Sequence, residues 1–121
     1  MNIKLIKATT DDMDYVNSFK LKSINNIDII YVGDRKVGVL EYLQKDGYIY
    51  LELIEIEEQY RKQGIAKSVV DLVKGNKGDI FGDCAPNEVS IAFWSKLGAE
   101  FEESVEDGLA YNGCIPFVLY A

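Results

Sequence analysis

The sequence contains no histidine in its 121 residues. This absence excludes catalytic triads built on histidine, metal sites with imidazole ligands and the commonest general base of enzymes. Its two cysteines, Cys84 and Cys114, are too few for a disulfide framework or a thiolate zinc site. We therefore expect no metal centre, and we interpret both cysteines as small buried hydrophobic residues rather than nucleophiles.

Long apolar runs are also missing. No stretch is long enough to span a membrane, and the segment after Met1 lacks the apolar core of a secretory signal. The missing secretory segment predicts a location in the cytoplasm. The length predicts a single domain over residues 1–121.

Basic residues are outnumbered. Thirteen lysines and arginines against twenty acidic residues give a net charge of −7. This balance argues against nucleic acid as a general partner and is compatible with a cationic amine as substrate. The acidic surplus also has an ordinary explanation, because net charge favours solubility.

The most informative segment begins with an apolar run at residues 48–56. Apart from Glu52 and Glu55, every residue in it is β-branched, aromatic or leucine. Apolar residues at both odd and even positions predict a central strand covered on both faces. Strict alternation would place Glu52 on the same face as Ile54 and Ile56.

A basic turn and a helix follow this strand. Apolar residues recur at helical spacing from residue 65 to 73, and Gly75 is a natural stop. The first turn of a helix has unpaired N–H groups and the positive end of the dipole, which Arg61, Lys62 and Lys67 reinforce. Because Gly64 allows close approach to the backbone, the turn suits a pyrophosphate. An ordinary strand–loop–helix connection with solvated charges is the alternative.

The remaining pattern predicts further elements. We expect strands at 3–7, 27–32, 37–44, 79–84, 99–105 and 114–121. We also expect a helix from a cap at Thr10 or Asp11 to near Lys22, and another that starts at Pro86 or Asn87 and ends at Gly98. The order β-α-β-β-β-α-β-α-β-β predicts an α/β (α+β) fold with a single mixed, mostly antiparallel sheet flanked by helices.

Two local patterns resemble those of a known superfamily. Arg61-x-x-Gly64-x-Ala66 after an apolar strand is similar to the acetyl-CoA signature of the GNAT N-acetyltransferases: Arg or Gln, two residues, Gly, one residue, Gly or Ala. Residues 87–98 resemble the later motif, which has an Asn, a helix with aromatic residues, then Lys-Leu-Gly. The element order also matches. The turn fits neither a Walker P-loop nor a dinucleotide fingerprint, because the required glycines are absent.

The resemblance implies a GNAT acyl-CoA acyltransferase-like fold and transfer of an acetyl group from acetyl-CoA to a primary amine of a small molecule, peptide or protein. It implies that backbone groups of the strand bind the pantetheine arm and those of residues 62–67 bind the pyrophosphate. The implied cofactor-binding residues are Ile54, Glu55, Ile56, Arg61, Lys62, Gln63, Gly64, Ile65, Ala66, Lys67, Asn87 and Trp94.

The catalytic groups are less well indicated. Glu52 is the candidate general base, with Glu55 and Glu41 as alternatives. Many members of the superfamily have a tyrosine acid at the position of Trp94, and an indole cannot supply a proton. A substitute hydroxyl would come from Tyr111 or Tyr120.

Two other hypotheses stay open. In the first, the chain is a non-catalytic or partner-dependent acyl-CoA-binding module. In the second, it is a small α/β protein that binds no coenzyme A. The region between the first two strands, which helps to wall the acceptor site in the superfamily, is short here. A second subunit could complete it, and the aromatic C-terminus (Phe117, Tyr120) permits a homodimer.

Overall fold

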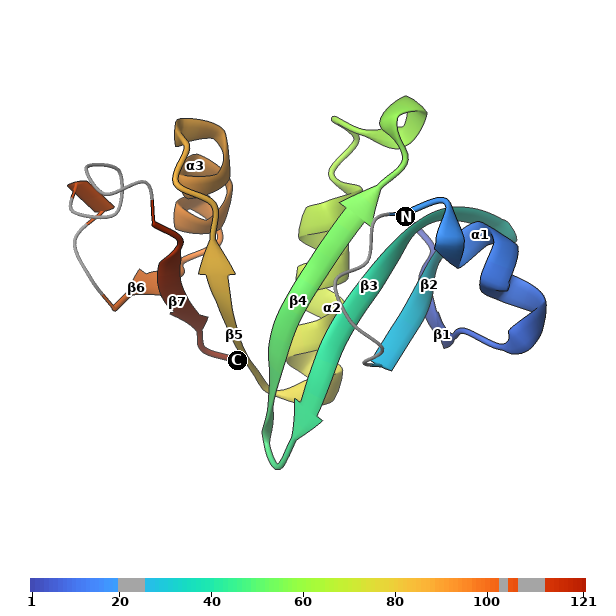
Figure 1. Ribbon diagram of the computed structural model, residues 1–121, viewed down its shortest axis with the longest axis horizontal. Coiled ribbons are helices and arrows are strands. Elements are labelled where there is room, and N and C mark those ends of the chain that lie inside the picture. The colour runs from blue at the N-terminus through green and yellow to red at the C-terminus, as the bar shows by residue number, and fades with distance from the viewer. Residues whose placement is uncertain (20–25, 103–104, 107–112) are drawn as a thin grey trace.

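A seven-stranded sheet forms the centre of the computed structural model, which describes residues 1–19, 26–102, 105–106 and 113–121 (Figure 1). The strand order is β1-β2-β3-β4-β5-β7-β6, and every neighbouring pair is antiparallel except β4 and β5. The strands are β1 (Ile3–Lys7), β2 (Asn26–Val32), β3 (Arg35–Lys45), β4 (Tyr48–Ile56), β5 (Asp79–Cys84), β6 (Glu100–Phe101) and β7 (Ile115–Leu119).

α-Helices and short 3-10 turns accompany the sheet: η1 (Thr10–Asp12), α1 (Met13–Asn17), η2 (Glu58–Tyr60), α2 (Ile65–Lys77) and α3 (Glu88–Lys96). The predicted fold class and element order are therefore confirmed. No helix among the residues described is long and apolar enough to cross a membrane.

Each face of the sheet has its own hydrophobic cluster. Buried side chains of α2, among them Val69 and Val73, pack with Ile49 and Leu51 of β4 in the larger cluster. The other face carries a smaller cluster around Val16 of α1. β4 is thus a central strand, as its apolar residues on both faces predicted.

Two helix ends differ from the prediction. α1 begins after a turn in which the Asp12 carboxylate accepts from the Thr9 N–H at 2.8 Å and from its hydroxyl at 3.1 Å, so Thr9 rather than Thr10 or Asp11 caps this segment. α1 ends at Asn17, and the predicted end near Lys22 lies outside the described residues.

The end of α2 also lies further along the chain than predicted. The helix passes through Gly75 and continues to Lys77. Gly78 ends it, with a left-handed φ of +91° that residues with a Cβ rarely adopt. A glycine by itself does not stop a helix. The left-handed conformation that ends this helix occurs at Gly78, three positions after Gly75.

The C-terminal region is also less regular than predicted. β6 has two residues, where the sequence predicted a strand over 99–105, and residues 103–104 lie outside the description. Cys84 is buried as expected. Cys114 is exposed, because it lies just before β7 enters the sheet. The prediction that Cys114 is a buried hydrophobic residue was therefore wrong.

β4 and β5 begin side by side and diverge toward their carboxyl ends (Figure 1). Their parallel pairing ends at Leu51 and Gly82. On the other side of β4, the register with β3 shifts where Glu41 pairs with Leu53 and Tyr42 pairs with Leu51, which leaves Glu52 as the extra residue of a β-bulge.

The bulge reverses the faces of β4 beyond Glu52. Ile54 and Ile56 pack in the cluster of α2, together with residues that precede the bulge, while Leu53 packs with the cluster of α1. Glu52 therefore does not share a face with Ile54 and Ile56. The prediction was wrong because one inserted residue shifts the alternation by one position.

Candidate functional site

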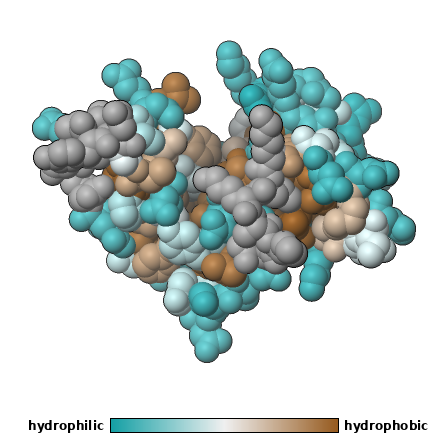
Figure 2. Space-filling model, viewed as in Figure 1, coloured by the Kyte–Doolittle hydropathy of each residue, from teal (hydrophilic) through white to brown (hydrophobic). Residues whose placement is uncertain are grey.

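A cavity of about 700 Å³ lies where β4 and β5 diverge. Its walls are the end of β4, the following turn, the first turn of α2 and one side of α3. Figure 2 shows the molecule hollowed at its upper edge, between the part that carries α3 and the part that carries the end of β4. All the predicted cofactor-binding residues except Gln63 and Asn87 line this cavity.

The N-terminus of α2 forms one wall of the cavity without a side-chain cap. The first helical N–H that bonds back is that of Ser68, which donates to the Gly64 carbonyl at 3.1 Å. The N–H groups of Ile65, Ala66 and Lys67 therefore have no partner within the helix. Together with the helix dipole they favour an anion at this wall.

The turn before α2 contains two left-handed residues, Lys62 at φ 65° and Gly64 at φ 78°. Such a turn brings successive N–H groups to one concave side, where they can bind an anion. A Cβ at Gly64 would have no atom of the described residues within 4 Å. The space above Gly64 is therefore open to a ligand.

Arg61 binds the turn to the end of β4. Its Nε–H donates to the Ile56 carbonyl at 2.8 Å, and its Nη2 lies 3.6 Å from Oε1 of Glu55. The side chain thus positions the turn, while Lys62 and Lys67 add positive charge at the cavity wall.

α3 contributes an apolar wall. Trp94 is 8% exposed, and its ring centroid lies 4.4 Å from that of Phe117 and 5.0 Å from that of Phe93. Val89, Ser90 and Phe93 line the cavity beside it, and so does Tyr60. The sequence prediction missed these residues, although the spacing of Val89 with Phe93, and of Ser90 with Trp94, marks one helical face.

Asn87 stands at the N-cap of α3. Its Oδ1 accepts from the Ser90 N–H at 2.8 Å, so the side-chain oxygen stabilises the helix. Asn87 and Gln63 do not line the cavity, and their predicted contact with a cofactor stays a prediction.

Tyr50 and Asp83 join β4 to β5 next to the last paired residues. The Tyr50 hydroxyl donates to Oδ2 of Asp83 on the face away from α2. This bond raises the pKa of Tyr50 to about 12, with further contributions from burial and from the charges of Asp83, Glu52 and Glu102. The tyrosine therefore stays protonated at neutral pH. No local sequence signal indicates this pair, because its members are 33 positions apart.

The predicted catalytic residues have different surroundings. Glu52 is partly buried on the same face as Tyr50, and Glu55 is engaged with Arg61. Glu41 is completely buried, and neither of its carboxylate oxygens has a hydrogen-bond partner among the residues described. Tyr120 is 57% exposed and Tyr111 lies outside the described residues.

Neither a family model nor a curated protein matches the sequence. Solved structures match over the whole chain. An acetyltransferase from Thermus thermophilus superposes with a TM-score of 0.78 at 12% identity, covering 100% of this chain and 98% of its own. The N-acetyltransferase YlbP of Bacillus subtilis, in complex with coenzyme A, has a TM-score of 0.71 at 18% identity, with 99% and 96% covered.

A third structure carries the superfamily name. A GNAT family acetyltransferase from Elizabethkingia anophelis, with acetyl-CoA bound, has a TM-score of 0.64 at 13% identity, and the match covers 99% of both chains. The matches cover 99–100% of this chain, so the similarity extends over nearly its whole length. The chain has the fold of the GNAT N-acetyltransferases.

Proposed function

We propose that this protein binds acetyl-CoA in the cavity between β4 and β5 and transfers the acetyl group to a primary amine in the cytoplasm. One observation carries the proposal: the unpaired N–H groups of α2 and the β4 edge beyond Leu51 line one cavity. A volume of about 700 Å³ lies in the range of small-molecule and cofactor sites. Coenzyme A or acetyl-CoA in two of the similar structures supports the same ligand.

Each end of the cavity suits a different part of the ligand. The N–H groups of Ile65, Ala66 and Lys67, with the charge of Lys62, suit the pyrophosphate. Among the described residues, no strand pairs with β4 on the β5 side beyond Leu51, so the β4 backbone there is available to amide groups of the pantetheine arm. Trp94 and Phe93 offer an apolar wall.

Acetyl-CoA supplies an activated acyl group, and the protein supplies position. Holding an amine against a thioester carbonyl removes much of the entropic barrier to direct attack. A β4 backbone N–H beside the carbonyl would stabilise the developing negative charge. The prediction of Glu52 as the base depended on a face shared with Ile54 and Ile56, which the bulge removes, so we propose that water receives the proton from the ammonium.

A second candidate function is acyl-CoA binding without appreciable turnover. Trp94 favours it, because this residue stands where the superfamily often has a tyrosine acid. Its indole packs on Phe117 in the core and cannot protonate a leaving thiolate. Activity with an amine would exclude this candidate.

The first experiment is calorimetric titration of acetyl-CoA into the wild-type protein and into Gly64→Val. We expect micromolar binding, about −8 kcal/mol, for the wild type. The valine should abolish it, because its side chain enters the open space above the turn. Gly33→Val is a matched control: Gly33 also has a positive φ, 61°, and no atom within 4 Å of an added Cβ, but it lies in the β2–β3 turn.

The control variant should bind acetyl-CoA like the wild type although it carries similar backbone strain. Circular dichroism would verify that both variants are folded. Unchanged affinity in a folded Gly64→Val would show that the turn is not the pyrophosphate site. If the wild type gives no heat and no shift in melting temperature at high ligand concentration, both candidate functions are wrong.

A further inference from the structure

Acidic side chains gather on the face of the sheet away from α2, where β4 and β5 begin to diverge. Asp83 accepts a hydrogen bond from the Tyr50 hydroxyl, and Glu52 and Glu102 are close enough for their charges to act on the same hydroxyl. The Glu102 N–H bonds to the carbonyl of Pro116, which pairs with Asp83 across β7 and β5. We call Glu52, Asp83 and Glu102 the acidic corner.

Glu41 supplies an independent observation beside this corner. The bulge places Glu41 directly opposite Glu52 and Leu53, with its side chain on the same face. Glu41 is 0% exposed, and its two oxygens have no donor in the part of the chain that the structure describes. Burying a carboxylate without a partner is costly, so a group of this kind requires an explanation, and a functional role or a bound cation is one.

Within the described residues, no ion pair involves Glu41, Glu52, Asp83 or Glu102. The lysines and Arg61 that line the acyl-CoA cavity belong to the turn and to α2, beyond the end of β4. The basic turn with α2 and the group of carboxylates near the bulge are therefore opposite in charge. The first suits a pyrophosphate and the second suits a cation.

We propose that the acceptor is an aliphatic diamine or polyamine, whose second ammonium group binds the carboxylates of Glu52 and Glu41 at the bulge. The inference rests on the proposed acetyl transfer and names its substrate class. An ammonium group supplies the donors that Glu41 lacks, and an alkyl chain suits the adjoining Leu53. A neutral or anionic acceptor would leave the carboxylates uncompensated.

The reaction balances without a further reactant. The terminal ammonium loses a proton, its nitrogen forms a bond to the acyl carbon, and the C–S bond breaks with its electron pair on sulfur. The nitrogen loses a second proton, and one proton returns to the thiolate. The products are the monoacetylated diamine, free coenzyme A and one released proton. The second ammonium takes no part in these bonds.

The test compares putrescine with butylamine, which has the same carbon chain but one charge. The readout is release of the coenzyme A thiol in the presence of saturating acetyl-CoA. For the wild type we expect kcat/KM for putrescine to exceed that for butylamine by about tenfold or more, beyond the statistical factor of two equivalent amines. The difference should appear mainly in KM, because the second ammonium contributes to binding.

Glu52→Gln and Glu41→Gln should each reduce the ratio of kcat/KM for putrescine to kcat/KM for butylamine to within about threefold, whatever their effect on the rate with butylamine, while the affinity for acetyl-CoA changes little. A general base would behave differently, since its removal slows both amines alike. Asp46→Asn, at an exposed position of the β3–β4 hairpin, makes the same change in net charge and should retain the preference. Thermal melts would verify that Glu41→Gln is folded.

The outcomes separate this inference from the proposed function. If acetyl-CoA binds and butylamine or a neutral peptide amine reacts as fast as putrescine, the substrate class is wrong and the transferase stands. A preference that survives in both glutamine variants would also overturn the inference. If acetyl-CoA does not bind the wild type, the proposed function fails and this inference falls with it.

Discussion

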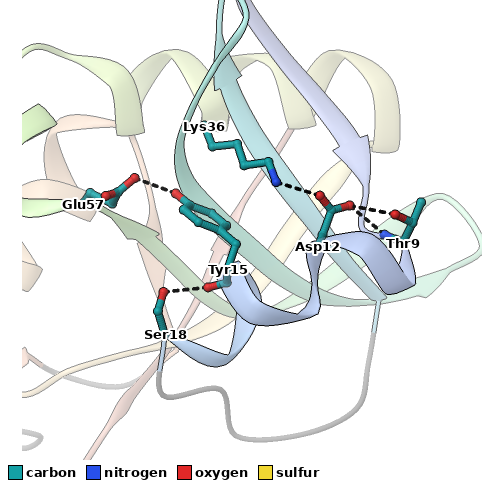
Figure 3. Close-up of polar contacts among 6 residues, drawn as sticks. All are labelled: Thr9, Asp12, Tyr15, Ser18, Lys36 and Glu57. Carbon is teal, nitrogen blue, oxygen red and sulfur yellow. Dashed lines mark hydrogen bonds and ion pairs between the residues drawn. The ribbon is translucent and has the colours of Figure 1, made fainter.

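The hydroxyl of Tyr15 in α1 donates a 2.7 Å hydrogen bond to Oε2 of Glu57, the residue that follows β4 (Figure 3). A second contact holds the start of this helix: Nζ of Lys36 in β3 lies 2.9 Å from Oδ1 of Asp12, the N-cap residue of α1. Burial, the bond to Glu57 and that carboxylate's charge raise the pKa of Tyr15. α1 is therefore fastened to the segment that leads into the cavity turn.

Tyr15→Phe should lower the free energy of unfolding by about 1–2 kcal/mol, because it removes a partly buried hydrogen bond to a charged acceptor. Denaturant titration followed by circular dichroism measures this change. Tyr120→Phe, at an exposed position, serves as the control and should have little effect. Equal stabilities for the two variants would mean that the Tyr15–Glu57 bond makes no net contribution.

Tyr50 predicts a specific loss of stability in alkali. Its pKa is raised from 10.0 to about 12 in the folded protein, chiefly by the bond to Asp83. A raised pKa means that folding favours the protonated form, so this contribution is complete below pH about 10 and disappears as pH rises toward about 12. In Tyr50→Phe, the free energy of unfolding should therefore decline less steeply across this interval than in the wild type.

Asp83→Asn tests the cause of that shift. Without the carboxylate, the alkaline decline should resemble that of Tyr50→Phe, as measured by urea unfolding at a series of pH values. Parallel curves for the wild type and both variants would show that Tyr50 and Asp83 do not interact in this way.

The end of α2 predicts opposite effects for two similar substitutions. Gly75→Ala should stabilise the protein by about 0.5–1 kcal/mol, because Gly75 lies inside the helix and no atom lies within 4 Å of an added Cβ. Gly78→Ala should destabilise it by more than this amount, because φ is +91° and the Cβ would lie 2.2 Å from the Gly47 carbonyl oxygen.

Thermal unfolding of the two alanine variants measures both effects. A helix that ended at Gly75, as the sequence alone predicted, would reverse the expected order.

Trp94 provides a test of the chemistry in the proposed function. Trp94→Tyr brings a hydroxyl to the cavity wall and should accelerate acetyl transfer by about tenfold or more, the lower range of general acid catalysis. Trp94→Phe has a ring of similar size without the hydroxyl, and both variants lose part of the contact with Phe117. If the tyrosine variant is no faster than the phenylalanine variant, departure of the thiolate does not limit the rate.

Local sequence predicted the parts of the site that depend on neighbouring residues. β4 was predicted with the bounds that the structure has, and Gly64 lies in the turn before α2, where the motif placed it. The position of α3 followed from Asn87 and the aromatic residues after it. Such signals lie within one strand, turn or helix, where period and capping chemistry act directly.

Contacts between strands could not be predicted in the same way. The bulge at Glu52 arises from the register with β3, and it moves Ile54 and Ile56 to the face of α2. Glu52 therefore belongs with Tyr50 instead of with the residues that line the acyl-CoA cavity. Nothing in a single strand indicates such a shift, because it is set by pairing with another segment.

By itself, the sequence determined the strand–turn–helix that forms the proposed cofactor site, the order of the elements and the exclusion of histidine chemistry. The tertiary structure decided that Tyr50 meets Asp83 and that Glu41 is completely buried opposite the bulge. The physical reason is range: backbone propensity and periodicity act over a few residues, whereas burial and charge pairing depend on which distant segments the sheet brings together.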